Sequence, residues 1–551
     1  MISAVLRCTA AKLVSLTYTY LTGGTRLKII CSVSLRALTA TEARDKNRCG
    51  TPCPSLWLFF SVLLSAPAVN AAEPTVKSQP FSPEIVQQLA RDLATAPFDT
   101  LPQAPQALSE LDYSQYRRIN YQRDAAVWGD SPTKFSIQLF APGFLYSDLV
   151  DIDIVENGVT RPVQVSEDSF HAPDPKIAAL LAEIGKYAGM RLHYPLNRKD
   201  YADEFLVFQG ASFFRGVSKG QSYGLSARGL AIDVAEPTGE EHPVFRRFWV
   251  ERPSSRHKSM VVHALLDSPR VTGAYRFGIY PGEPTRVDID ATLYPRNALP
   301  HVGLGTLTSM FMHGGPANPA GDSDYRPQVH DSQGLAIERG NGERLWRPLI
   351  NPENLQISAF ADENPGGFGL IQRSRDFEDY EDLEARYDRR PSAWVEPLSQ
   401  WGAGQVRLVE IPSNSEANDN VVAYWFPNGG LAAGEPYRFS YRLTWPNDSP
   451  GLGELAKVVR SNDGQKLFSE QREVMIDWSN AGPRQGLSLE ASISRGSITD
   501  TTLQANPFIG GARAFVSFDP GDADTAELRV VLKRDGKPAG ETWLYRWLRA
   551  G

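Results

Sequence analysis

Cysteine is absent from most of this sequence. The chain has 551 residues and four cysteines, and all four fall within the first 53 positions: Cys8, Cys31, Cys49 and Cys53. The rest of the chain can therefore form neither a disulfide nor a cysteine metal site, and packing alone must stabilise it.

Signatures of metal and nucleotide chemistry are also missing. The eight histidines are scattered without the spacing of a zinc site, and neither a Walker loop nor a dinucleotide fingerprint occurs. We expect no metal and no cofactor. One Gly-x-Ser-x-Gly motif occurs at residues 216–220, but the residues after it start a helix poorly, so Ser218 is interpreted as a loop serine and not as a nucleophile.

The first 71 residues differ from the rest because they are basic. Arg44, Lys46 and Arg48 precede an apolar run at residues 56–64, and Val69-Asn70-Ala71 supplies the small residues that a signal peptidase requires. An apolar run of about ten residues is half the length that spans a bilayer. We predict export, a cleaved signal peptide at residues 1–71, a mature chain from Ala72, and no membrane span after cleavage.

Basic clusters are lacking after residue 71, and that part of the chain is acidic. This charge argues against nucleic acid and against anionic membrane surfaces as partners. A neutral substrate suits this acidic part of the chain better than a polyanion does.

Forty prolines and 45 glycines, spread along the chain, would interrupt long helices repeatedly. Helices are predicted only at residues 82–95 and 175–188. Alternating apolar segments predict strands elsewhere, for example at residues 134–140, 205–208, 259–266, 406–411 and 437–445. With few helices to cover a parallel sheet, an all-β fold of antiparallel sandwiches is expected.

A turn-rich stretch at residues 446–454 divides the strand pattern. Residues 455–551 have the length and the alternating segments of an immunoglobulin-like sandwich. The preceding domain, residues 72–446, is large for one core and should be a double or extended β-sandwich.

Tryptophans mixed with Arg, Asp, Glu and Asn mark residues 325–425. Sugar rings stack their C–H faces on indole and phenol rings, while their hydroxyls need in-plane donors and acceptors, so a glucan groove requires this mixture. Residue types alone favour the alternative that these tryptophans belong to a core.

Several long segments of unusual composition resemble the periplasmic glucan biosynthesis G/D family. The resemblance extends from about Phe81 to Tyr545, and the segments that carry it are residues 210–215, 223–233, 264–269, 308–311, 340–349, 364–370 and 390–397. It implies a periplasmic protein that helps to make osmoregulated periplasmic glucans, whose backbone is β-1,2-linked. It also implies a large galactose-mutarotase-like β-sandwich followed by a small immunoglobulin-like domain.

The same resemblance implies the partners. β-1,2-Glucan is the expected ligand, and the inner-membrane glucan synthase is a candidate protein partner; the oligomeric state is left open. No Arg-Arg pair occurs before residue 71, which favours the general secretion route and the G branch of the family over the D branch.

Some members of the family are similar to inverting glycoside hydrolases or transglycosylases. Such enzymes need a carboxylic acid and a carboxylate base about 6.5–9.5 Å apart. By resemblance, Asp419 is the acid, Asp331 the base, and Tyr387 lies near the acid. Judged from the residues alone, either aspartate is more typical of a turn.

Four further residues are predicted to contact the substrate because arginine suits hydroxyl clusters and tryptophan suits ring faces. They are Arg228, Trp346, Arg347 and Trp394. These residue types are equally typical of a core or of ion pairs.

Three functions compete. The first is an inverting glucanase or transglycosylase that acts on the β-1,2-linked backbone, which the presence of both Asp331 and Asp419 favours. The second is a non-catalytic glucan-binding or assembly factor of the same pathway. The third, a hydrolase of imported polysaccharide, fits the fold but not the biosynthetic resemblance.

Overall fold

The computed structural model describes residues 78–315, 324–450 and 453–549, which belong to one compact unit. The predicted signal peptide and the start of the mature chain at Ala72 lie outside the described residues. In these ranges, no helix has the length and apolar character needed to cross a membrane. Strands dominate and are arranged in several sheets, so the predicted all-β class is confirmed.

The two predicted helices are present. Helix α1 (Pro83–Ala94) begins with proline at its first position and buries Val86 and Ala90. Helix α4 (Pro175–Ile184) begins after Asp174, whose side chain accepts a hydrogen bond from the Lys176 backbone N–H. The prediction that this helix reaches residue 188 was wrong, because Gly185 adopts a left-handed conformation and ends it. Two single-turn helices, α2 (Gln106–Ser109) and α3 (Tyr113–Tyr116), were not predicted.

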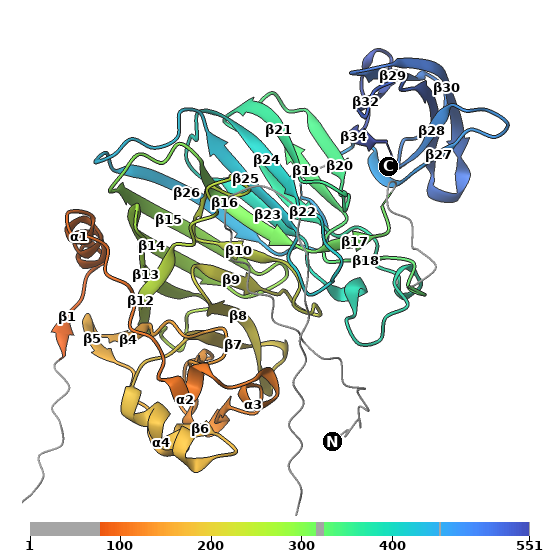
Figure 1. Ribbon diagram of the computed structural model, residues 1–551. Helices are drawn as coiled ribbons and strands as arrows, with labels where there is room; N and C mark the ends of the chain where they lie inside the picture. The colour runs from red at the N-terminus through yellow and green to blue at the C-terminus, as the bar shows by residue number, and fades with distance from the viewer. Residues whose placement is uncertain (1–77, 316–323, 451–452, 550–551) are drawn as a thin grey trace, which may run out of the picture. The chain divides into compact units, whose positions relative to one another are not determined.

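Two large sheets contain most strands (Figure 1). The sixteen-stranded sheet has the order β1 (Gln79–Pro80), β5 (Val159–Pro162), β4 (Asp151–Glu156), β12 (Val244–Glu251), β13 (Met260–Asp267), β14 (Val271–Tyr280), β15 (Arg286–Pro295), β26 (Tyr437–Thr444), β23 (Ala393–Pro397), β22 (Gly367–Ile371), β19 (Gly334–Glu338), β20 (Arg344–Pro348), β34 (Thr542–Leu548), β32 (Thr525–Arg534) and β29 (Leu487–Ile493), with β33 (Lys537–Pro538) beside β32.

The ten-stranded sheet has the order β21 (Gln356–Glu363), β24 (Ala403–Glu410), β25 (Val421–Pro427), β16 (Val302–Ser309), β10 (Ser226–Arg228), β9 (Phe213–Gly216), β8 (Tyr201–Gln209), β7 (Gly189–Arg198) and β3 (Ser136–Phe140), with β11 (Ala231–Ile232) beside β16. A four-stranded sheet consists of β27 (Lys457–Gln465), β28 (Arg472–Ser479), β31 (Gly511–Asp519) and β30 (Ser497–Asn506). Two short ribbons pair β17 (Phe311–His313) with β18 (Val329–His330) and β2 (Asn120–Tyr121) with β6 (Phe170–His171).

Among the described strands, all pairs are antiparallel except β4 with β12 and β20 with β34. The preference for antiparallel pairing predicted from the scarcity of helices is therefore observed. Antiparallel strands can leave one face solvated, which gives each strand an inward apolar and an outward polar row.

The main core lies between the two large sheets. Phe277 of β14 meets Phe208 of β8 at a ring-centroid distance of 5.2 Å and Phe214 of β9 at 5.5 Å. Because side chains alternate along a strand, the neighbouring Arg276 and Arg215 point to the outer faces, and both are exposed. The outer face of the ten-stranded sheet positions the candidate site described below.

A second core joins the C-terminal strands to the end of the sixteen-stranded sheet. It packs Trp478 and Trp543 against Trp346 and Trp394. Nearby, a buried ion pair connects the segment after β22 to the segment before β34: the Arg373 guanidinium donates to both carboxylate oxygens of Glu541, at 2.8 and 2.6 Å. The domain boundary predicted between residues 446 and 455 stays a prediction.

This ion pair gives a stability prediction. Arg373 and Glu541 are almost inaccessible to solvent, so Arg373→Ala leaves an uncompensated buried carboxylate and should lower the free energy of unfolding by about 3–5 kcal/mol. Urea denaturation followed by tryptophan fluorescence measures this change. The control Arg495→Ala removes an exposed arginine of the same C-terminal region and should change stability by less than about 0.5 kcal/mol. Equal midpoints for the two variants would contradict the prediction.

Candidate functional site

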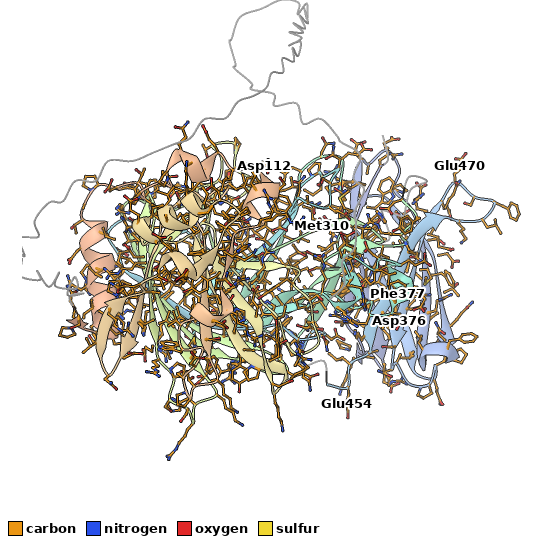
Figure 2. All side chains as sticks on the ribbon, turned by 90° about the horizontal axis from the view of Figure 1, so that it is seen from below. Asp112, Met310, Asp376, Phe377, Glu454 and Glu470 are labelled. Atoms are coloured by element: carbon orange, nitrogen blue, oxygen red, sulfur yellow. The ribbon has the colours of Figure 1, made fainter. Side chains whose placement is uncertain are left out.

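Asp331 is positioned by a short strand ribbon. It follows β18 directly, and its backbone N–H donates to the Met310 carbonyl at 2.9 Å (Met310 is labelled in Figure 2). Its side chain is buried, with 4% of the residue exposed. The guanidinium of Arg390 donates to one carboxylate oxygen at 2.6 Å, so the buried carboxyl group has one charged partner.

Asp419 comes from the loop at residues 411–420 between β24 and β25. The next residue, Asn420, is buried and fixes the end of this loop: its side-chain oxygen accepts from the Phe311 N–H at 2.8 Å, and its amide donates to the Phe311 carbonyl at 3.0 Å. Phe311 begins β17, which pairs with β18 just before Asp331. The same ribbon therefore anchors both aspartates.

The two carboxyl groups lie in one electrostatic site. The pKa of Asp331 is raised to about 6, chiefly by burial and also by the charge of Asp419, against the opposing charges of Arg390 and Arg215. Solvent reaches Asp419, yet the surrounding protein raises its pKa as well, against the opposing charges of Arg215, Arg228 and Arg390. Protein atoms around a carboxyl group disfavour its charged form and raise its pKa in this way.

Tyr387 belongs to the same site. It starts a 3-10 turn (Tyr387–Arg389), its ring is buried, and the Arg390 guanidinium lies over the ring at 4.6 Å from the centroid. Its hydroxyl donates to Glu416 at 2.9 Å, in the loop that ends with Asp419. Burial raises the pKa of Tyr387, and the charge of Glu416 raises it further, so the phenol keeps its proton at neutral pH.

Buried amides hold these elements together. The Gln372 side-chain amide donates to the His330 carbonyl at 3.0 Å and to the Tyr387 carbonyl at 3.2 Å. Burial lowers the pKa of His330 to about 3, so its ring is neutral and serves this network rather than titrating at the site. Tyr387 and Asp331 therefore keep a fixed relation to each other.

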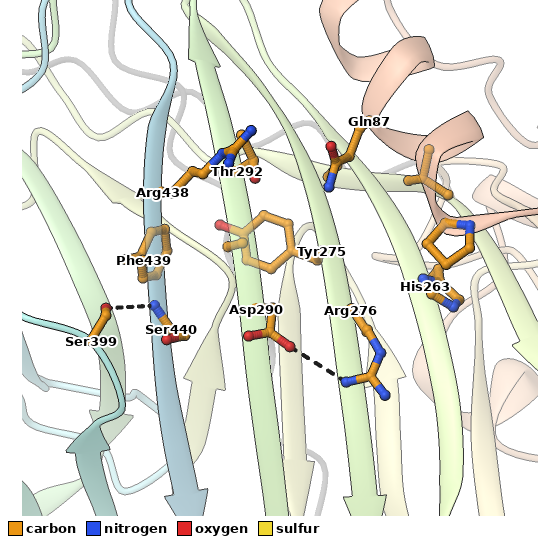
Figure 3. Close-up of a pocket in the computed structure, with 14 residues that line it drawn as sticks. Gln87, His263, Tyr275, Arg276, Asp290, Thr292, Ser399, Arg438, Phe439 and Ser440 are labelled. Atoms are coloured by element: carbon orange, nitrogen blue, oxygen red, sulfur yellow. Dashed lines mark hydrogen bonds and ion pairs between the residues drawn. The ribbon is translucent and has the colours of Figure 1, made fainter.

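A cavity elsewhere in the molecule was considered as an alternative site. It occupies about 270 Å³ between α1 and the outer face of β13–β15 and β26, and Figure 3 shows His263, Arg276 and Asp290 along it. Its charged groups pair with each other, Arg276 with Asp290 at 3.4 Å, and Asp331, Asp419 and Tyr387 are not among its lining residues. Its only lining carboxyl group, Asp290, is exposed and paired with Arg276, so the cavity is a weaker candidate for acid catalysis.

Among the described residues, no group of three or more His, Cys, Asp and Glu side chains is arranged to hold a metal ion. The aspartate site can support proton transfer by carboxyl groups. A carboxyl group with a raised pKa can hold a proton for donation, and a second one that ionises near neutral pH can accept a proton.

Comparisons with known proteins agree with this architecture. Residues 81–547 match the family model described as "Periplasmic glucan biosynthesis protein, MdoG". The chain is 57% identical over 491 residues to "Glucans biosynthesis protein G 2" of Shewanella oneidensis, which covers 89% of this chain and 92% of the relative. It is 46% identical to "Glucans biosynthesis protein G" of Vibrio cholerae serotype O1 (86% and 87% covered) and 45% identical to that of Rhodopseudomonas palustris (87% and 95%).

The chain belongs to the MdoG family. The family predicted from the sequence is thereby confirmed.

The structure of this MdoG-family chain brings four of the predicted site residues together: Asp331, Asp419, Tyr387 and Arg228. Arg228 is buried on β10, where it donates to the Thr308 hydroxyl at 2.8 Å and lies over the Phe213 ring. Their predicted roles stay predictions, and they share one site.

The other three predicted substrate contacts lie elsewhere. Trp346 and Trp394 are buried in the second core, with 3% and 4% of each residue exposed. Arg347 is fully buried and pairs with Glu410 at 3.1 Å. Trp346 also lines a cavity that contains neither aspartate of the site. The predicted contacts of these three residues with the substrate stay predictions.

Sequence reasoning missed Arg215, Arg390 and Glu416. Arg215 ends one of the segments that carry the family resemblance, and Arg390 begins another. These segments could have indicated that both arginines belong to the site. Glu416 stands three residues before Asp419 in a polar loop, and nothing in the pattern distinguished it.

The raised pKa of Asp331 gives a pH prediction. Because its pKa is about 6 in the folded chain instead of 3.8, folding favours the protonated form. The resulting stabilisation is complete below pH 3.8 and is lost as the pH rises through 6, which lowers the free energy of unfolding by about 3 kcal/mol. Asp331→Asn cannot titrate, so its free energy of unfolding relative to the natural protein should rise by up to that amount between about pH 4 and pH 7.

Urea denaturation at several pH values measures this difference. Asp130→Asn changes an exposed aspartate, and its free energy of unfolding should differ from that of the natural protein by a constant amount at every pH. If the difference is also constant for Asp331→Asn, the carboxyl group of Asp331 has an ordinary pKa and the electrostatic description of the site is wrong.

Proposed function

We propose that this protein acts in glucan biosynthesis in the periplasm, as an inverting glucanase or transglycosylase on the β-1,2-linked glucan backbone. The single observation that carries the proposal is the pair Asp331 and Asp419, which interact electrostatically, each with a raised pKa. The family description and the names of the relatives supply the substrate class.

Asp419 acts as the general acid in this proposal. Its raised pKa favours the protonated form, and solvent reaches it, so a glycosidic oxygen can approach. As the bond from that oxygen to the anomeric carbon breaks, the carboxyl proton moves to the leaving oxygen. Arg215, Arg228 and Arg390 lie close enough to stabilise the carboxylate that remains.

Asp331 acts as the base. A pKa of about 6 leaves it mostly ionised at neutral pH, and the ion pair with Arg390 orients it. Water, or a hydroxyl group of a second glucan chain, attacks the anomeric carbon from the opposite face and gives its proton to Asp331. The first nucleophile gives hydrolysis and the second gives transfer; both invert the anomeric centre.

Tyr387 has a positioning role in this scheme. Its hydroxyl already donates to Glu416, and its high pKa keeps the proton in place. The hydroxyl oxygen can therefore accept a hydrogen bond from a sugar hydroxyl or from the attacking water while the proton bonds to Glu416.

The alternative is a non-catalytic glucan-binding or assembly factor. It uses the same site to bind a glucan, with Asp331 and Asp419 accepting hydrogen bonds from hydroxyls. It does not need a carboxyl group whose pKa is raised, and for this reason the enzymatic function is preferred.

Asp419→Asn separates the two functions. The amide keeps the size of the side chain and can still bond to a hydroxyl but cannot donate a proton as an acid, so turnover should fall by about 10²–10⁴. Reducing ends released from linear β-1,2-glucan by the purified protein measure turnover, and calorimetry measures glucan affinity, which should change little.

Asp522→Asn is the matched control because it alters an exposed aspartate of the C-terminal region, and its turnover should equal that of the natural protein. Unchanged turnover in Asp419→Asn would overturn the assignment of the acid. No turnover in the natural protein, with glucan still bound, would favour the binding factor.

A further inference from the structure

A second group of polar residues extends across the outer face of the ten-stranded sheet. In the register of the sheet, Arg191 of β7 lies opposite Val207 of β8, and Val207 lies opposite Arg215 of β9. Two strand spacings separate Arg191 from Arg215, about 10 Å. His193 of β7 faces Glu204 of β8 beside this row.

Three buried polar atoms in this group have no hydrogen-bond partner among the described residues. They are Nε2 of His193, Nε of Arg191 and the hydroxyl of Tyr223. Buried polar atoms nearly always have partners, so three such atoms at one place need an explanation. His193 is 9% exposed, and its Nδ1 lies 3.3 Å from the Ala202 carbonyl, which leaves the Nε2 lone pair as an acceptor.

The charged members of the group are only partly paired. Arg191 donates to Glu204 at 3.1 Å. Glu204 also lies close enough to Tyr223 to raise the pKa of that phenol. In the described ranges, the exposed guanidinium of Arg215 makes no hydrogen bond or ion pair.

Arg215 connects this group to the aspartate site. Its charge acts on Tyr223 on one side and on Asp331 and Asp419 on the other. Phe214 of β9 pairs with Ala227 of β10. Arg215, the next residue of β9, therefore lies on the strand beside Ser226 and Arg228 of β10. The polar row is therefore continuous with the site that contains the two aspartates.

We propose that Arg191, His193, Glu204, Tyr223 and Arg215 form a second carbohydrate subsite, which holds a glucose unit of the chain remote from the bond at Asp419. The proposal rests on the proposed function for the identity of the ligand and adds the place and chemistry of a binding site. Arg215 bridges the two subsites.

The available groups suit a neutral polyhydroxylated ring. Sugar hydroxyls both donate and accept, and the group offers donors on Arg191 and Arg215, acceptors on His193 and Glu204, and a hydroxyl on Tyr223 that does both. The carboxylate of Glu204 pairs with Arg191, which leaves Arg215 to bond to ring and hydroxyl oxygens of the sugar. A buried hydroxyl that lacks a partner in the protein gains one when a sugar hydroxyl reaches it.

Binding is best measured with Asp419→Asn, which cannot consume the ligand. Calorimetry compares a β-1,2-linked disaccharide, which fills the aspartate site alone, with a longer linear oligosaccharide that reaches the second subsite. Adding Tyr223→Phe should weaken the longer ligand roughly 5-fold, the effect of one hydrogen bond. Adding Arg215→Gln should weaken it at least as much, and Arg215→Lys should restore part of the loss.

Tyr223→Phe distinguishes a ligand site from a structural role. The phenol bonds to no group of the described protein, so its removal should not lower thermal stability. Arg438→Gln is the control, because Arg438 is an exposed arginine on an outward row of the other large sheet and should leave both affinities unchanged.

The outcomes separate this proposal from the proposed function. If the natural protein turns over β-1,2-glucan but Tyr223→Phe and Arg215→Gln bind both ligands normally, the subsite is wrong and the function stands. If Tyr223→Phe loses affinity selectively for the longer ligand while the natural protein turns nothing over, the subsite stands and the enzymatic function is wrong. If no oligosaccharide binds, or Tyr223→Phe weakens both ligands equally, the subsite is wrong.

Discussion

The site depends on the cost of placing two carboxyl groups near each other. Like charges in a poorly solvated space disfavour ionisation of both groups, so one carboxyl group tends to retain a proton. Here burial adds to that repulsion for Asp331, and three arginines limit it. Arg390 donates a hydrogen bond to Asp331 and, by its charge, favours ionisation of both aspartates.

The fold supplies this arrangement through contacts between distant parts of the chain. Asp331 and Asp419 are joined through the β17–β18 ribbon and Asn420, while Arg215 reaches them from β9. The core between the two large sheets keeps the outer face of the ten-stranded sheet available for polar side chains. The outward side chains of this face can then take part in acid–base chemistry and in the recognition of hydroxyl groups while the core between the sheets stays packed.

Local pattern was sufficient for the fold class and for the strands predicted at residues 134–140, 205–208, 259–266, 406–411 and 437–445, because alternation and turn residues are encoded over a few positions. It predicted α1 well and placed the end of α4 too late, since the left-handed conformation of Gly185 was not considered. The predicted roles of Asp331 and Asp419 came from the family resemblance alone. Trp346 and the free guanidinium of Arg215 could not be classified, because burial and pairing between residues far apart in sequence are set by the tertiary structure.

The central claim is that the two aspartates cleave or transfer glucan with inversion. The most direct measurement is proton NMR of the anomeric centre during the first minutes of reaction with linear β-1,2-glucan, before the product mutarotates. The account predicts that the new reducing end appears first as the α-anomer and only later equilibrates to the β-anomer. A β-anomer formed first would contradict it, because retention requires a nucleophile on the protein in place of a water activated by Asp331.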